Sequence, residues 1–92
     1  MKPSTKTIPP ITVRSEDQLS SAIRRLRKAQ GLSQVDLAKK AGVTQATISR
    51  IEQGNKESMI KTIFLILAAL GVELLVSGKT QTNQSGSLEG LI

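Results

Sequence analysis

Small and polar side chains recur on one side of a short helix that is predicted near the middle of the chain. Helical spacing puts Ile48 and Ile51 on the inner arc, and the outer arc carries Gln45, Ala46, Ser49 and Arg50. A glutamine amide can pair with adenine, an arginine can pair with guanine or a phosphate, and an alanine can contact a thymine methyl group. These residues are therefore candidates for reading bases in a DNA groove, with an ordinary solvated helix face as the alternative.

A second group of residues could bind phosphate. Gln34 and Thr44 lie at the beginnings of two predicted helices, where unpaired backbone N–H groups and the helix dipole attract anions. Asn55 and Lys56 lie in the loop that follows the base-reading helix, and for them phosphate contact and plain solvation are both open. The residues predicted to contact phosphate are Ser33, Gln34, Thr44, Thr47, Asn55 and Lys56.

Capping residues and glycines mark the helices that must position these side chains. A first helix is predicted from Ser15 to just before Gly31, and a second begins at Ser33 and ends at Gly42. A third helix is predicted from residue 45 to about residue 53, with Thr44 as its cap. Two short helices joined by residues 42–44 are typical of a helix-turn-helix.

The segment after the third helix is apolar and has too little chain to cover it. Residues 59–70 predict a fourth helix that is apolar on nearly all sides, so we expect a second subunit to cover part of it. Residues 72–76 predict a short strand, although a helical extension is also open, and a lone strand needs a partner such as a symmetry-related copy. The predicted dimer contacts are Ile63, Leu67, Leu70, Val72, Leu74 and Val76.

Charge and composition favour duplex nucleic acid as a partner. The net charge is +6, and residues 14–56 carry nine Lys/Arg against four Asp/Glu, whereas residues 57–92 carry two against three. This asymmetry indicates polyanion contact at one end and association at the other. Phe64 is the only aromatic residue, so no platform exists for stacking single-stranded bases, and RNA is the weaker choice.

Several classes of function are disfavoured by what the sequence lacks. It has no histidine, no cysteine, no clustered carboxylates and no glycine-rich phosphate loop, so we expect no enzyme, no catalytic residue, no metal site and no cofactor. The longest apolar stretch, residues 63–72, is about half the length that spans a bilayer, and no signal peptide is recognisable. We therefore expect a cytoplasmic protein, associated with the nucleoid and not with a membrane.

The chain is predicted to contain one domain with an extension at each end. Residues 1–14 contain all three prolines and are expected to form a flexible arm. Residues 15–77 form the predicted DNA-binding and dimerisation domain. Residues 78–92 are a polar, flexible tail whose Leu88, Leu91 and Ile92 could engage a partner protein.

Residues 20–70 resemble the Cro/C1-type helix-turn-helix of phage repressors and xenobiotic-response-type (XRE) regulators. The matching residues are Gln34, Leu37, Ala38, Gly42, Thr44, Gln45, Ile48, Ile51, Glu52 and Gly54. The resemblance implies a mainly α fold of four to five helices that binds double-stranded operator DNA. It also implies an ion pair between Arg27 and Glu52, which is structural and not a DNA contact.

The C-terminal half resembles the HipB-type antitoxins more closely. A short apolar strand replaces the usual fifth helix, and residues 45–49 match that group. The resemblance implies a homodimer closed by paired strands, a toxin kinase as protein partner, and repression of the protein's own operon. A free-standing XRE-type regulator and a protein-interaction module are the alternatives, and the outer face around Gln45 and Arg50 favours DNA binding over the latter.

Overall fold

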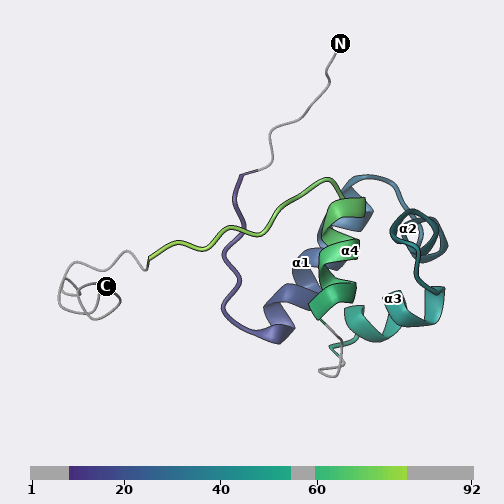
Figure 1. Ribbon diagram of the computed structural model, residues 1–92, viewed down its shortest axis with the longest axis horizontal. Helices are drawn as coiled ribbons and strands as arrows, with labels where there is room; N and C mark the ends of the chain where they lie inside the picture. Colours follow the sequence, from purple (N-terminus) through teal and green to yellow (C-terminus); the bar gives the residue numbers. More distant parts are fainter. Residues whose placement is uncertain (1–8, 55–59, 79–92) are drawn as a thin grey trace, which may run out of the picture.

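Four helices make up the regular structure of residues 9–54 and 60–78, the parts of the chain that the computed structural model describes (Figure 1). The helices are α1 (Glu16–Ala29), α2 (Gln34–Ala41), α3 (Gln45–Glu52) and α4 (Ile60–Ala69). Each coincides with a predicted helix, so the mainly α fold is confirmed. None of the described helices has the length and apolar character needed to cross a membrane.

A reciprocal capping box begins α2. The Ser33 hydroxyl accepts a hydrogen bond from the backbone N–H of Asp36 at 2.9 Å, and the Asp36 carboxylate accepts one from the backbone N–H of Ser33 at 3.0 Å. These hydrogen bonds with Ser33 lower the pKa of the Asp36 carboxyl. Two orphan N–H groups are satisfied in this way, which fixes where the helix starts.

The cap of α1 differs in one detail from the predicted box. The Ser15 hydroxyl accepts from the backbone N–H of Gln18 at 3.1 Å, as expected. The Gln18 side chain, however, accepts from the backbone N–H of Arg14 and not from that of Ser15. The cap therefore extends one residue towards the arm, because the flexible glutamine side chain reaches past the Ser15 backbone.

Gly42 makes the turn between α2 and α3 possible. Its φ of 76° is left-handed, a conformation that costs an L-residue with a Cβ atom about 1–2 kcal/mol. Its N–H donates to the carbonyl of Ala38 at 2.9 Å, which closes the end of α2. Thr44 then caps α3 by accepting from the backbone N–H of Thr47 at 3.1 Å, so the second short helix starts at once.

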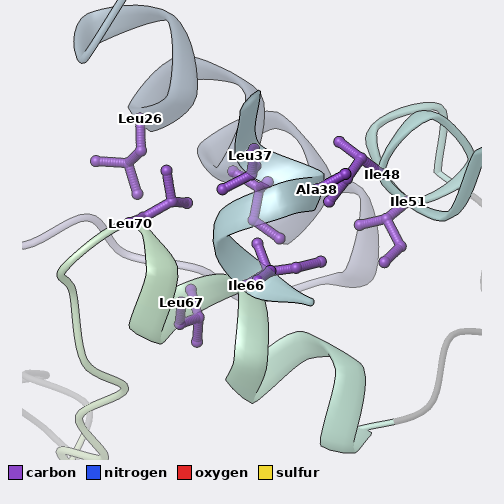
Figure 2. Close-up of a cluster of buried hydrophobic side chains, with 10 residues drawn as sticks. Leu26, Leu37, Ala38, Ile48, Ile51, Ile66, Leu67 and Leu70 are labelled. Atoms are coloured by element: carbon purple, nitrogen blue, oxygen red, sulfur yellow. The ribbon is translucent and has the colours of Figure 1, made fainter. Parts of the chain in front are cut away.

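The core draws one fully buried aliphatic side chain from each helix. These are Ile23 of α1, Leu37 of α2, Ile48 of α3 and Ile66 of α4. Leu37, Ile48 and Ile66 are seen converging around α2 in Figure 2, and α2 packs against both α3 and α4. Burial of each such side chain contributes about 1.5–3 kcal/mol, so the orientation of α3 is set by the packing of its inner face.

The chain beyond α4 leaves apolar side chains uncovered. Residues 72–78 run on from the helix without regular secondary structure in the single chain, and Leu74, Leu75 and Val76 are 54%, 72% and 93% exposed. Strand pairing across a dimer needs a second chain, so the strand stays a prediction. On α4 itself, Ile60, Phe64 and Leu65 face outward, 71%, 50% and 40% exposed.

The N-terminal arm lies beside this uncovered segment. Residues 9–14 have no regular secondary structure and pass close to the chain that follows α4 (Figure 1). Ile11 and Val13 of the arm line the same open groove as Val72 and Leu74, above the apolar face of α1. One groove is therefore lined both by the N-terminal arm and by the segment that follows α4.

Candidate nucleic-acid interface

The outer face of α3 carries the residues predicted to read bases. Gln45, Ala46 and Arg50 are exposed and Ser49 is half-buried. On the opposite face Ile48 is fully buried, and Ile51 is 4% exposed. The helix therefore presents a polar surface that could enter a DNA groove.

Gln45 is held by a hydrogen-bonded side chain from the preceding helix. Its Nε2 donates to Oε1 of Gln34 at 2.7 Å. Nε2 of Gln34 in turn donates to Oε1 of Glu52 at 3.2 Å. The amide at the first turn of α3 is thus connected through α2 to the last residue of α3.

This connection ends at a buried ion pair. Nε and Nη2 of Arg27 donate to the two carboxylate oxygens of Glu52 at 2.7 and 3.0 Å, and Nη1 donates to the carbonyl of Leu32 at 2.8 Å. The two side chains are only 9% and 3% exposed. The ion pair implied by the family resemblance is present, and it ties α1 to the end of α3.

The protonation states of this pair follow from their contacts. The hydrogen bond to Glu52 raises the pKa of Arg27, outweighing the effect of burial. Burial alone would raise the pKa of Glu52, but hydrogen bonds from Arg27 and Gln34, together with the charge of Arg27, bring it below its ordinary value. Glu52 is therefore an ionised acceptor at neutral pH.

The residues predicted to contact phosphate fall into three situations. The hydroxyls of Ser33 and Thr44 cap their helices and are exposed, and the hydroxyls of Thr44 and Thr47 are 2.9 Å apart. The Gln34 amide is already engaged between two side chains, which leaves its backbone N–H at the start of α2 as its natural phosphate donor. Asn55 and Lys56 lie outside the described residues.

The residues predicted at the dimer contact differ in how far the single chain buries them. Leu67 and Leu70 are 6% and 3% exposed because they pack into the chain's own core. Ile63 and Val72 are half-buried, and Leu74 and Val76 are exposed.

Sequence reasoning missed which part of α4 would remain open. The large apolar residues of this helix that remain exposed are Ile60, Phe64 and Leu65. An almost wholly apolar helix gives no periodic signal that separates an inner from an outer face. The link between Gln34 and Glu52 was also missed, because it depends on how α2 packs against α3.

Comparisons with known proteins identify the family to which this fold belongs. A family model described as helix-turn-helix matches residues 23–76. Antitoxin HipB of Escherichia coli strain K12 is 35% identical over 78 residues, which are 84% of this chain and 89% of that protein.

Solved structures of HipB have the same fold. A HipB-O4 20mer complex superposes with a TM-score of 0.72 at 33% identity and covers 76% of this chain and 99% of that chain. A HipA-HipB-O2-O3 complex gives a TM-score of 0.71 at 33% identity, with the same two coverages of 76% and 99%.

Proposed function

The chain belongs to the helix-turn-helix family that includes antitoxin HipB, and we propose that it is a sequence-specific DNA-binding repressor and antitoxin. It binds a double-stranded operator upstream of its own gene and represses its own operon. This chain covers 89% of antitoxin HipB and 99% of the HipB chains in two solved complexes. This similarity supports both DNA binding and the antitoxin role.

The observation that carries DNA binding is the arrangement around Gln45. A glutamine amide stands exposed at the first turn of a helix whose opposite face is locked into the core, and a second glutamine holds it in place. The first turn is the part of a recognition helix that contacts base edges. Base reading by Gln45, Ala46, Ser49 and Arg50 is the function that this arrangement suits best.

Phosphate contacts complete the proposed interface. The beginnings of α2 and α3 offer backbone N–H groups and hydroxyls that can bind the DNA backbone. The residues at or next to these two helix starts are Ser33, Gln34, Thr44 and Thr47. The sequence adds Asn55 and Lys56 after α3. These contacts orient the domain on the duplex, whereas the side chains of α3 specify the site.

We propose that the protein acts as a homodimer. Leu74 and Val76 beyond α4, and Phe64 on its open face, are too exposed for a single chain, and a second copy would cover them. Pairing of residues 72–76 between the copies would also satisfy backbone groups that the single chain leaves open. A dimer would place two α3 helices on one face of the duplex.

The proposed protein partner is a toxin of the class that HipB-type antitoxins bind, a kinase by the resemblance. A solved assembly of a relative contains both HipA and HipB. The proposed role is that of a cytoplasmic, nucleoid-associated regulator, not an enzyme.

The test is a gel-shift and footprinting experiment on the DNA upstream of the protein's gene. We expect retention of this duplex against excess scrambled competitor, and protection of two half-sites whose centres lie about one helical turn apart. Equal binding to the scrambled duplex would contradict a sequence-specific repressor.

The antitoxin role is tested separately by co-expression with the product of the adjacent gene. Copurification of a stable complex, and relief of growth arrest by the antitoxin, are expected. Operator binding without any complex would instead support a free-standing regulator.

A further inference from the structure

An apolar groove runs between the N-terminal arm and the segment that follows α4. One wall is the arm, which contributes Ile11 and Val13, and the other wall is the segment, which contributes Val72 and Leu74. Apolar side chains of α1 form the floor. Ile11, Val13 and Leu74 are 36%, 38% and 54% exposed. The groove is therefore an apolar surface that the single chain leaves partly open.

The backbones of the two walls also lack partners. Residues 9–14 and 73–78 make no backbone–backbone hydrogen bond within the described chain, either with each other or with another element. Each wall therefore offers a row of backbone donors and acceptors beside apolar side chains. An added strand binds to a surface of this kind, because it supplies the missing hydrogen bonds and covers the side chains together.

The chain carries a strand of the composition that this groove requires. Residues 72–76 are apolar except for Glu73, and their Leu75 and Val76 are 72% and 93% exposed. In a dimer, each copy would present one open groove and one uncovered segment. A reciprocal exchange of the two segments covers both at once, as a two-fold interface requires.

Two-fold symmetry determines the order of the strands in such an exchange. When the segment of a second copy lies between the arm and the segment of the first copy, the reverse must also hold. The four strands then follow one another as the first copy's arm, the second copy's segment, the first copy's segment and the second copy's arm. The two segments lie in the centre of this sheet, and the two arms form its edges.

The arm has the composition of an edge strand. Pro9 and Pro10 lack the backbone N–H that a central strand needs, and proline in sheets is found at edges and at strand ends. Ile11, Thr12 and Val13 are β-branched, which favours strands. Side chains alternate along a strand, so Ile11 and Val13 share one face, and both line the groove. The two prolines would also block the addition of another chain at the outer edge.

We propose that residues 9–14 are part of the dimer interface, where the arm pairs with residues 72–76 of a second copy that lie in the groove. This inference rests on the proposed homodimer and extends it, because the sequence predicts only a flexible arm at this end. The arm holds the segment of the second copy against α1. The dimer is then closed by four strands and not by a single pair.

The test uses disulfide cross-links, which are unambiguous here because the sequence contains no cysteine. One chain carries Thr12→Cys, and a second, tagged chain carries Glu73→Cys, Leu74→Cys, Leu75→Cys or Val76→Cys. The two chains are mixed under reducing conditions, allowed to exchange subunits and then oxidised. Because adjacent strands bring paired residues within disulfide reach, we expect a mixed covalent dimer on a non-reducing gel for the position that the register places opposite Thr12.

The matched control is Thr12→Cys oxidised without the second chain. Two strands separate the arms in the proposed sheet, so their backbones lie about 14 Å apart. Cα atoms that are joined by a disulfide lie within about 7 Å of each other. The control should therefore give no covalent dimer. A covalent dimer that forms as fast in the control as in the mixture would overturn the inference, because it would show an arm that moves freely.

A second measurement compares two neighbouring residues on opposite faces of the arm. Val13→Asp places a charge in the groove, whereas Thr12→Asp adds the same charge at a residue that does not line it. Sedimentation should show that Val13→Asp raises the dimer Kd at least about tenfold, and that Thr12→Asp changes it less than about threefold. Circular dichroism should show the same helix content in both variants.

The outcomes separate this inference from the proposed function. The absence of a mixed cross-link at all four positions, with a dimeric wild-type protein, would overturn the inference and leave the repressor dimer intact. Equal effects of Val13→Asp and Thr12→Asp on the dimer Kd would also overturn it. A wild-type protein that binds the operator as a monomer would instead overturn the proposed homodimer, and the inference with it.

Discussion

Arg27 and Glu52 lie 25 positions apart in the sequence, yet the guanidinium of Arg27 donates hydrogen bonds to both carboxylate oxygens of Glu52, at 2.7 and 3.0 Å. Both side chains are almost completely buried. A buried pair of this kind is costly to break from one side, since the remaining charge is left without a partner.

Arg27→Met should therefore destabilise the fold strongly. We expect a loss of about 3–5 kcal/mol in the free energy of unfolding, measured by urea denaturation at pH 7. Arg25→Met, at an exposed position of the same helix, is the control and should change stability by no more than about 0.5 kcal/mol. Equal effects of the two substitutions would show that the pair contributes nothing.

Stability should also fall in acid. The pKa values of Glu52 and Asp36 are both lower in the folded protein than their ordinary values. Their contributions to the free energy of unfolding are therefore fully present above the pKa of the unfolded chain, which is about 4 for these residues. These contributions are lost as the pH falls through the lower pKa values of the folded protein. Urea midpoints measured from pH 7 to pH 3 should decline below about pH 4. In Glu52→Gln the urea midpoint should decline less steeply with falling pH. An unchanged slope in this variant would show that Glu52 does not contribute to the loss of stability in acid.

The capping box of α2 predicts a smaller effect. Ser33→Ala removes the hydroxyl that accepts from the Asp36 backbone, and we expect a loss of about 0.5–2 kcal/mol in the free energy of unfolding. Ser21→Ala, on the exposed side of α1, is the matched control. Thermal unfolding followed by circular dichroism would compare the two, and identical midpoints would argue against a stabilising cap.

The C-terminal segment should carry the dimer. Leu74→Asp combined with Val76→Asp places two charges on side chains that are 54% and 93% exposed in the single chain. Light scattering at micromolar concentration should then report a monomer, whereas Ser77→Asp should remain dimeric. A double variant that still dimerises would contradict the C-terminal segment as the main dimer contact and leave the open face of α4 around Phe64 as the remaining part of the proposed interface.

Local patterns in the sequence were sufficient to predict the four helices. Ser15, Ser33 and Thr44 cap helices as expected, and Gly42 adopts the left-handed turn. These signals act within a few residues along the chain, so they can be read without knowing the tertiary structure.

The contacts between helices were harder to predict. The ion pair of Arg27 was implied by family resemblance, but the bond from Gln34 to Glu52 was not predicted from local spacing, because it forms only when α2 and α3 pack together. Leu67 and Leu70, which were predicted at a dimer contact, also belong to the chain's own core, and this too depends on how the helices pack together. On an apolar helix, the buried face is chosen by the neighbouring helices and not by the helix itself.

The proposed role of α3 is to read operator DNA through Gln45, and the most direct test is the affinity of Gln45→Ala for the operator and for its base-substituted forms. We predict that its affinity for the wild-type operator falls by about 1–3 kcal/mol, and that its preference disappears at one base pair of each half-site. Kd values should be measured by fluorescence anisotropy at fixed salt, beside the wild-type protein. Unchanged affinity together with an unchanged base preference would contradict the assignment of α3 as the reading helix.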